Sequence, residues 1–252
     1  VFNDFETEGI TLLPSINKQN YATITNNRFK SIYHSMVQIC DGRCYIAYNE
    51  CSGNNGSAFN AFCYDSEICY NKFFDGKRSA AIDLCEDGLY KSYNVFVHDN
   101  DCVDTYDLAY VCGQKIKLSN NRINSNKASC GIHIFNGKQS DWECNNTPLN
   151  QVKTESANID ITGNHFKDIK GYDIFSESRY ISDISIIGNY FDKKFDPNSN
   201  QKTYYHFKHG VCNLKICSNI FFTLQNNQHS KGYLGLGEIY GGDNYSSNGH
   251  LI

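Results

Sequence analysis

One short pattern recurs eight times along this chain and limits the folds that it can adopt. In "IKLSNNRI" (116–123), aliphatic residues alternate, an asparagine follows, and another apolar residue stands two positions later. The asparagines are Asn27, Asn49, Asn71, Asn100, Asn121, Asn164, Asn189 and Asn219. Their spacings are 22, 22, 29, 21, 43, 25 and 30 residues, and "WECN" (142–145) is a candidate degenerate copy within the longest interval. A period near 22 residues predicts a solenoid, in which each coil buries its inward side chains on its neighbours.

The asparagine suits a corner between two strands of a coil. Its short side chain carries both a donor and an acceptor, so it can bond to the same amide one coil above and below. Asparagine also tolerates the left-handed backbone region that a sharp inward turn needs. Three positions before it stand Ile24, Ile46, Ile68, Val97, Leu118, Ile161, Ile186 and Ile216. Two positions after it stand Phe29, Cys51, Phe73, Cys102, Ile123, Phe166, Phe191 and Phe221, and both sets are predicted to form buried columns.

Two kinds of solenoid carry such a ladder, and the surrounding residues separate them. A leucine-rich repeat has leucine eight positions before the asparagine, where this chain has Gln19, Asp41, Cys63, Ser92, Gly113, Ser156, Ile181 and Val211. Instead, a second short strand recurs in "MVQIC" (36–40), "FNAFC" (59–63), "AIDLC" (81–85), "LAYVC" (108–112), "GIHIF" (131–135) and "GYDIF" (171–175). Over roughly residues 20–225 the chain therefore resembles the right-handed parallel β-helix family, the pectate-lyase-like superfamily. This resemblance predicts an all-β solenoid of about 22-residue coils, wound in the right-handed sense that parallel crossovers favour.

Alternation along the second strand predicts a row of side chains on the surface. With Ile39, Phe62, Leu84, Val111, Ile134 and Ile174 inward, the residues that point outward are Gln38, Ala61, Asp83, Tyr110, His133 and Asp173. The later segment "YYHFKH" adds His206 to this row and places Phe207 inward. The row contains residue types that can transfer protons or contact a sugar.

The family resemblance implies a function for this row. β-Helix proteins include polysaccharide lyases, glycoside hydrolases and phage tailspikes, and their acid and base groups lie on such outward rows. By this resemblance Asp83 is a candidate general acid or base, Tyr110 and His133 are candidates for proton abstraction by a lyase, and Asp173 and His206 are candidates for carbohydrate binding.

The signature motifs of the polygalacturonases are missing, and arginines are few, so the enzymatic activity stays open. We expect a polysaccharide-binding and possible polysaccharide-degrading module of a virion tailspike or surface fibre. The alternatives are a non-catalytic structural or adhesive β-helix and a secreted pectate-lyase-like enzyme.

The twelve cysteines divide by position. Cys51 and Cys102 replace phenylalanine in an inward column and are predicted to be small core residues. Cys40, Cys63, Cys85 and Cys112 end successive second strands, where a thiol stack, disulfides and a metal site are the three alternatives. Thiols are favoured, because neighbouring parallel strands suit the disulfide torsion poorly. Many thiols also suit assembly in a reducing cytosol, as for a virus particle.

Composition narrows the partners. A net charge of -4 without an arginine cluster argues against nucleic acid, and no run approaches the roughly 18 apolar residues of a membrane span. No cofactor is expected, and no metal site either, because the CxxxC of Cys40 and Cys44 lacks a second matching pair. We expect one β-helix over residues 1–225 and a Gly-, Tyr- and Asn-rich cap or association tail over 226–252. The resemblance to tailspikes implies a homotrimer or larger virion assembly, at a virion surface or outside the cell, that meets a cell-surface glycan.

Overall fold

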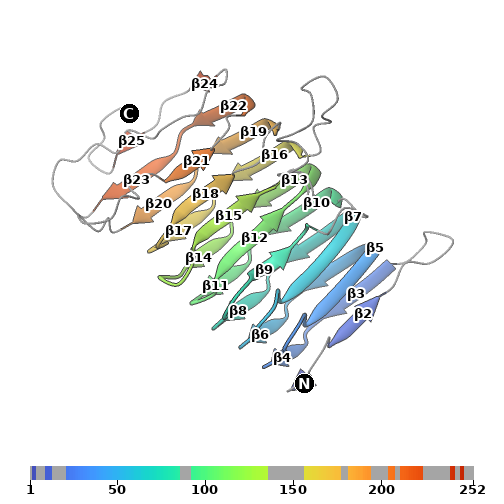
Figure 1. The fold of residues 1–252 in the computed structure, drawn as a ribbon. Helices are drawn as coiled ribbons and strands as arrows, with labels where there is room; N and C mark the ends of the chain where they lie inside the picture. Colours follow the sequence, from blue (N-terminus) through green and yellow to red (C-terminus); the bar gives the residue numbers. More distant parts are fainter. Residues whose placement is uncertain are drawn as a thin grey trace, which may run out of the picture.

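The computed structural model describes residues 2–3, 9–12, 21–85, 92–135, 156–176, 181–193, 204–207, 211–223, 239–241 and 245–246. Every element in these ranges is a β-strand, and neighbouring strands pair in parallel. The coils stack along one axis, so that β2 (Ile10–Leu12) lies near one end and β24 (Ile239–Gly241) near the other (Figure 1). The predicted parallel β-solenoid is therefore confirmed, and its right-handed winding stays a prediction. Nowhere in these ranges is there a helix long and apolar enough to cross a membrane.

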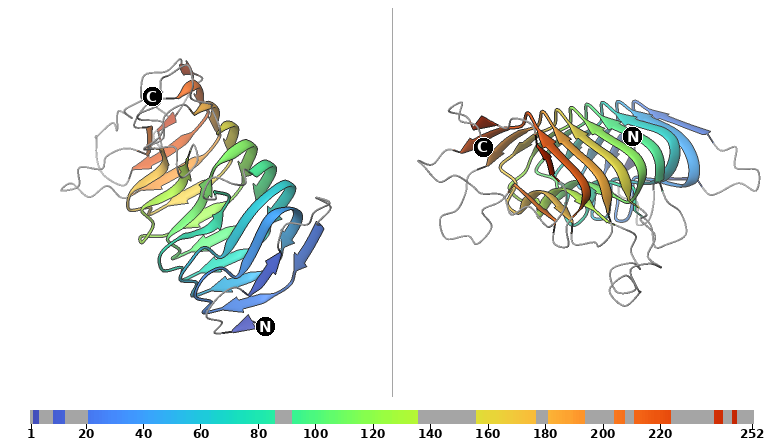
Figure 2. Two further views of the ribbon diagram at one scale, coloured as in Figure 1. Left: turned by 45° about the vertical axis from the view of Figure 1, so that its right-hand side comes forward. Right: turned by 90° about the horizontal axis from the view of Figure 1, so that it is seen from above.

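Each coil contributes to three faces, and face A is a continuous sheet of ten short strands, eight of which directly follow a ladder asparagine. In sheet order these are β1 (Phe2–Asn3), β4 (Arg28–Lys30), β6 (Glu50–Ser52), β8 (Lys72–Phe74), β11 (Asp101–Val103), β14 (Arg122–Asn124), β17 (His165–Lys167), β20 (Tyr190–Lys193), β23 (Ile220–Thr223) and β25 (Tyr245–Ser246). The two views of Figure 2 show the coils lying one behind another.

Faces B and C form one 15-stranded sheet, because two 11-residue strands, β5 (Val37–Ala47) and β7 (Phe59–Cys69), run through both of them. Face B continues with β2, β9 (Ala80–Asp83), β12 (Asp107–Val111), β15 (Cys130–Ile134), β18 (Tyr172–Ser176) and β21 (Tyr205–Phe207). Face C continues with β3 (Tyr21–Thr25), β10 (Ser92–His98), β13 (Gly113–Ser119), β16 (Ala157–Thr162), β19 (Ser182–Ile187), β22 (Cys212–Cys217) and β24.

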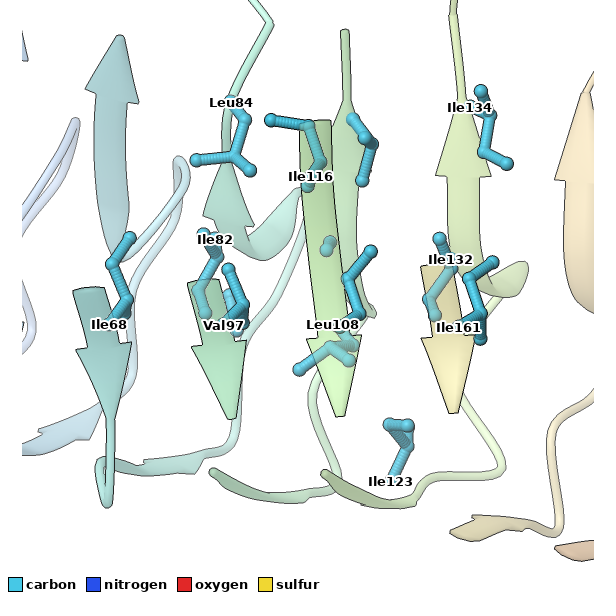
Figure 3. Packing of buried hydrophobic residues seen from close by; sticks show 14 of the residues in the cluster. Ile68, Ile82, Leu84, Val97, Leu108, Ile116, Ile123, Ile132, Ile134 and Ile161 are labelled. Atoms are coloured by element: carbon cyan, nitrogen blue, oxygen red, sulfur yellow. The ribbon is translucent and has the colours of Figure 1, made fainter. Parts of the chain in front are cut away.

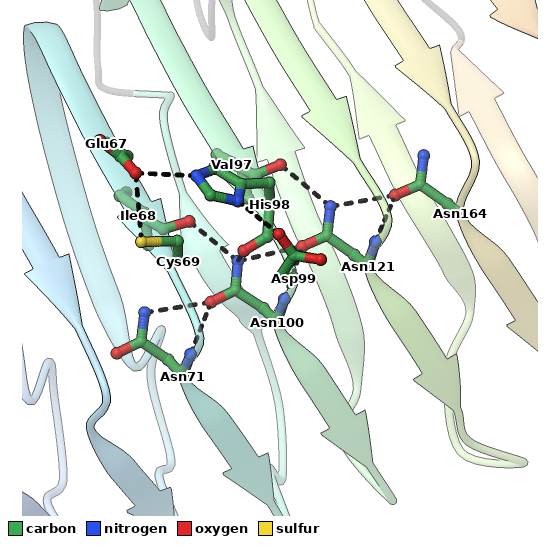
Figure 4. Close-up of polar contacts among 10 residues, drawn as sticks. All are labelled: Glu67, Ile68, Cys69, Asn71, Val97, His98, Asp99, Asn100, Asn121 and Asn164. Atoms are coloured by element: carbon green, nitrogen blue, oxygen red, sulfur yellow. Dashed lines mark hydrogen bonds and ion pairs between the residues drawn. The ribbon is translucent and has the colours of Figure 1, made fainter.

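The ladder asparagines lie at the corner between faces C and A, and we call this corner the asparagine corner. Each amide nitrogen donates to the side-chain oxygen of the next asparagine, as from Asn71 to Asn100 (3.0 Å) and from Asn100 to Asn121 (3.0 Å) (Figure 4). The same amide of Asn100 also donates to the backbone oxygen of Ile68, one coil back. Seven such links join all eight asparagines, so the predicted ladder is confirmed.

The left-handed backbone lies one residue earlier than predicted. The positive-φ residues of this corner are Asn26, Tyr48, Tyr70, Asp99, Asn120, Gly163, Gly188 and Ser218, each of which directly precedes a ladder asparagine. The ladder asparagine itself is selected for its amide alone, because its side chain must point into the stack. The preceding residue makes the turn, and residues as large as Tyr48 and Tyr70 occupy it (φ 58° and 55°).

Both predicted apolar columns are buried, and strand register stacks them coil on coil. Ile68 pairs with Val97 and Val97 with Leu118 on face C, while Phe73 pairs with Cys102 on face A. Figure 3 shows inward aliphatic side chains of successive coils, among them Ile68, Val97 and Ile161. Cys51 and Cys102 are buried in their column as predicted, whereas the side chain of Phe221 lies outside the described set.

The 43-residue interval is a single coil, which corrects the expectation of a degenerate copy inside it. The amide of Asn121 donates directly to Asn164 (3.0 Å), and β14 pairs with β17. Residues 142–145 themselves lie outside the described residues. In the predicted tail, β24 pairs with β22 and β25 with β23, so these two segments extend the sheets, and the boundary at residue 225 stays a prediction.

Candidate functional site

Face B presents the predicted row of outward side chains over its central coils. Register pairs Asn60 with Asp83, Asp83 with Tyr110, and Tyr110 with His133. His133 then pairs with Phe175, and Phe175 with His206. The structure therefore brings Asp83, Tyr110 and His133 onto consecutive coils, as the sequence predicted, and it places His206 further along the same row.

Two members of the predicted row are wrong. Ala61 is buried, and its neighbour Asn60 takes the outward place, because Asn60 pairs in register with Gln38 of β5 and with Asp83 of β9. Asp173 is also wrong, since the partner of His133 is Phe175. Both errors arose because the short strands were aligned on their last residues, and a bulge or corner moves that residue out of step.

Asp173 lies inside the solenoid, with 1% of its surface exposed. Its carboxylate oxygens make no hydrogen bond within the described residues, and Lys193 Nζ approaches one of them to 4.0 Å. Burial raises the pKa of Asp173 to about 7, which the charge of Lys193 partly offsets. The same burial lowers the pKa of Lys193, whose ammonium donates to the backbone oxygen of Gly171. Asp173 is thus half of a buried ion pair and is inaccessible to a glycan.

Aromatic rings dominate the outward surface of the later coils. We call this set the aromatic strip; its half-buried members are Tyr110, His133, Phe135, Tyr172, Phe175 and His206. Ring centroids lie 5.9 Å apart for Tyr110 and His133, and 4.7 Å apart for His133 and Phe175. Tyr172 stacks on Phe175 (5.2 Å) and on His206 (4.9 Å). The six rings therefore form one continuous band. The band crosses β12, β15, β18 and β21, which lie side by side in Figure 1.

The packing of the strip sets the protonation of its members. Burial alone lowers the pKa of His133 to about 4, so the imidazole is neutral at neutral pH. His133 lies between Phe135 (3.7 Å between centroids) and Phe175, and its Nε2 atom has no hydrogen-bond partner within the described residues. Burial also raises the pKa of Tyr110, and the nearby carboxylate of Asp107 adds to that effect. Both shifts hold these side chains neutral.

Two carboxylates flank the polar end of the strip. Asp83 is 9% exposed and accepts hydrogen bonds from the backbone of Cys85 (2.8 Å) and from Ser57 Oγ (3.4 Å). Asp107 accepts from the backbone of Cys130 (2.9 Å), and the Tyr110 hydroxyl hydrogen-bonds to it. Burial raises the pKa of Asp107, although these hydrogen bonds oppose the shift.

Sequence reasoning missed Asp107 and the rings of Phe135, Tyr172 and Phe175. By the alternation of the strand, Asp107 falls on the same side as the inward residues Ala109 and Val111. A charged residue at an inward position is costly to bury, so the sequence could have indicated that Asp107 has a special role.

The cysteine prediction is confirmed for the thiol state of the described cysteines, but it is wrong for the alignment of the four strand-end cysteines. Ten of the twelve cysteines have described side chains, and all ten are thiols. Cys40, however, pairs with Phe62, and Cys63 pairs with Gly42, so the four strand-end cysteines do not form one unbroken column. Cys63 lies one residue further along β7 than the partner of Cys40, so the two cysteines are offset.

The fold and its ladder define a class, the parallel β-solenoids with stacked asparagines. Comparisons with known proteins do not assign the chain to a family within this class. No protein-family model matches the chain, and the search of curated proteins finds no match.

Proposed function

We propose that this protein binds polysaccharide along the aromatic strip of face B. The observation that supports the proposal is the unbroken band of six rings on an otherwise regular parallel sheet. Rows of a parallel sheet repeat about every 4.8 Å, which is close to the length of one sugar unit in an extended chain. The C–H faces of pyranose rings pack on aromatic rings, and contiguous apolar side chains at a surface mark interaction sites.

The electrostatics of the strip favour binding over cleavage. A general base works best with a pKa near the operating pH, whereas His133 titrates at about 4 and the pKa of Tyr110 is raised. Neutral side chains of this kind can stack on a sugar and hydrogen-bond to its hydroxyls. The catalytic roles of Asp83, Tyr110 and His133 stay predictions, supported by their consecutive register and by the two carboxylates beside Tyr110.

The proposal extends to the setting of the protein. We place it in a tailspike-like or fibre-like module of the pectate-lyase-like type, at a virion surface or outside the cell, as a homotrimer or larger assembly. The family resemblance of the repeat supports this setting. The ten thiols add support, because they fit a protein that folds in a reducing compartment before it is released.

Binding to an array of acidic and neutral polysaccharides tests the proposal. Replacing Tyr172 and Phe175 together with Ala should weaken binding of the selected glycan by about tenfold or more, since each lost stacking contact is worth roughly 1 kcal/mol or more. The matched control is Tyr190→Ala, which removes an exposed tyrosine from face A. A glycan bound equally well by all three proteins would place the binding surface elsewhere.

The same incubations separate a binder from an enzyme. New reducing ends indicate a hydrolase, and ultraviolet absorbance of an unsaturated product indicates a lyase. If cleavage occurs, Asp83→Asn and His133→Ala should each lower the rate by about 10²-fold, the usual scale for a positioned acid or base. Cleavage that survives both changes would remove these residues from the mechanism.

A further inference from the structure

A second cluster of polar side chains lies on face C, where β7 and β10 end just before the asparagine corner. β7 ends in Glu67, Ile68 and Cys69, and alternation turns Glu67 and Cys69 to the same outward side. Cys69 pairs in register with His98, the last residue of β10, so the two side chains stand next to each other on adjacent coils. Asp99 follows at the corner with a left-handed backbone (φ 52°) and places its carboxylate beside the same imidazole.

The donor atoms of these residues converge. His98 Nε2 lies 2.8 Å from Glu67 Oε1, and Cys69 Sγ lies 3.4 Å from the same oxygen (Figure 4). The three donor atoms all fall within 4.8 Å of one another. Ligand atoms at roughly 2.0 to 2.3 Å around a tetrahedral Zn²⁺ are separated by about 3.3 to 3.6 Å, so small side-chain adjustments suffice to enclose an ion.

The carboxylates of Glu67 and Asp99 each face one ring nitrogen of His98, and a bound cation would satisfy the nitrogen that carries no proton. His98 Nδ1 lies 2.7 Å from Asp99 Oδ2, while Nε2 faces Glu67. A neutral imidazole has only one N–H, so it can donate to one of these carboxylates and must turn a lone pair toward the other. Asp99 holds Nδ1–H in the carboxylate–histidine arrangement that supports metal-binding histidines, and the lone pair on Nε2 then points at Glu67 and Cys69.

The aromatic neighbours fix the imidazole in this orientation. Phe96 stacks on the ring of His98 at 4.0 Å, and Tyr70 meets it edge-on at 5.5 Å. The side chain of His98 is 10% exposed, whereas that of Glu67 is 44% exposed, so the group of donors has a protected side and an open side. A ligand set of this kind needs such support, because loosely held side chains bind metal weakly.

We infer that Glu67, Cys69 and His98 form a binding site for a divalent transition-metal ion of the zinc class, with Asp99 as the positioning residue. A thiolate, an imidazole and a carboxylate together suit Zn²⁺ better than the hard cations Mg²⁺ and Ca²⁺, which prefer oxygen ligands alone. Three protein ligands leave a fourth position on the open side for water or for an oxygen of a bound molecule.

Cobalt serves as the probe, because Co²⁺ takes tetrahedral Zn²⁺ sites and reports a thiolate ligand by an intense near-ultraviolet charge-transfer band. The full chain is stripped with chelator under reducing conditions and titrated with Co²⁺ alone, then with Zn²⁺. We expect about one equivalent of Co²⁺ to produce the thiolate band and Zn²⁺ to displace it. Cys69→Ser should abolish the band, and His98→Gln should weaken Co²⁺ binding by tenfold or more.

Two further variants test whether the thiolate band arises from Cys69 and whether Asp99 positions His98. Cys217 occupies the same column of face C five coils further on, next to Ile187, so Cys217→Ser is a matched control that should keep the full band. Asp99→Asn keeps all three ligands and should lower Co²⁺ affinity by about 10-fold to 100-fold while keeping the band.

A band that persists in Cys69→Ser would assign the metal to other cysteines and overturn the inference. So would a folded wild-type protein that gives no thiolate band with Co²⁺, because Glu67, His98 and Asp99 would then form a hydrogen-bonded group that binds no metal. Circular dichroism of each variant confirms that the solenoid is intact, so loss of the band cannot be ascribed to unfolding.

Discussion

The asparagine corner and the outward row of face B are made by the same coils, yet they obey opposite rules. At the corner all eight coils use asparagine, while the six outward positions from Asn60 to His206 use five residue types. Each asparagine inside the ladder bonds to the coil above and the coil below, so any other residue leaves a neighbour unsatisfied. The outward side chains from Tyr110 to His206 are half-buried, so they meet solvent and have no such obligation. Repetition therefore marks what holds the solenoid together, and variation marks the surface that is available for function.

The largest test of this comparison sets an inward phenylalanine against an outward one. Phe166 is fully buried and stacks on Phe191 with 5.1 Å between ring centroids, whereas Phe175 belongs to the aromatic strip. Phe166→Ala should lower the free energy of unfolding by about 3 to 5 kcal/mol, since it leaves a cavity between coils. Phe175→Ala should cost roughly 1 kcal/mol or less. Denaturant unfolding measures both, and similar losses would break the distinction.

The second largest effect on stability is expected from a substitution in the asparagine ladder. Asn121→Ala removes the acceptor of the Asn100 amide and both donors of its own, to Asn164 and to the backbone of Val97. We expect a loss of about 1 to 3 kcal/mol, because buried polar groups are left unsatisfied. Asn27, half-buried at the first link, is the matched control. Asn27→Ala should lower the free energy of unfolding by clearly less than Asn121→Ala. Equal losses in denaturant unfolding would mean that an asparagine inside the ladder stabilises the fold no more than one at its end.

The buried pair of Asp173 and Lys193 predicts how stability changes with pH. The pKa of Asp173 is about 7 in the folded protein and 3.8 in its ordinary state, so the folded protein holds this proton more tightly. Stability from this group is present below about pH 4 and is lost as the pH rises toward 7, by roughly 1 kcal/mol per pH unit. Asp173→Asn should remove this slope. Unfolding of both proteins between pH 4 and 7 checks it, and parallel curves would show that the carboxyl titrates normally.

The repeat made the interior of the solenoid predictable from sequence. Alignment on asparagine gave the correct register for both buried columns, because each column carries the same kind of residue in every coil. Face B offered a weaker guide. Its strands begin and end at different points of the coil, so Ala61 and Asp173 were placed outside although both are buried.

The rest of the site depended on contacts that no spacing encodes. Tyr172 and His206 stack although they are 34 positions apart in the sequence, and the cluster of Glu67, Cys69 and His98 joins two coils. The turn residues were also missed in one respect. Asparagine was expected in the left-handed position, but the amide ladder requires that conformation of its predecessor, and several residue types accept it there.

The smallest expected effect concerns the cysteines, which lie both in the core and on face C. All ten described cysteines are thiols, so added reductant should leave the melting temperature unchanged. In the native protein, alkylation should reach Cys217, which is half-buried, well before Cys51 and Cys102, which are fully buried. Burial also raises the pKa of Cys51 and Cys102, which lowers their reactivity further. Peptide mapping after alkylation without reductant is the measurement. A disulfide between any two of the ten would contradict their thiol state, and early labelling of Cys102 would show that the inward column is less closed than its packing indicates.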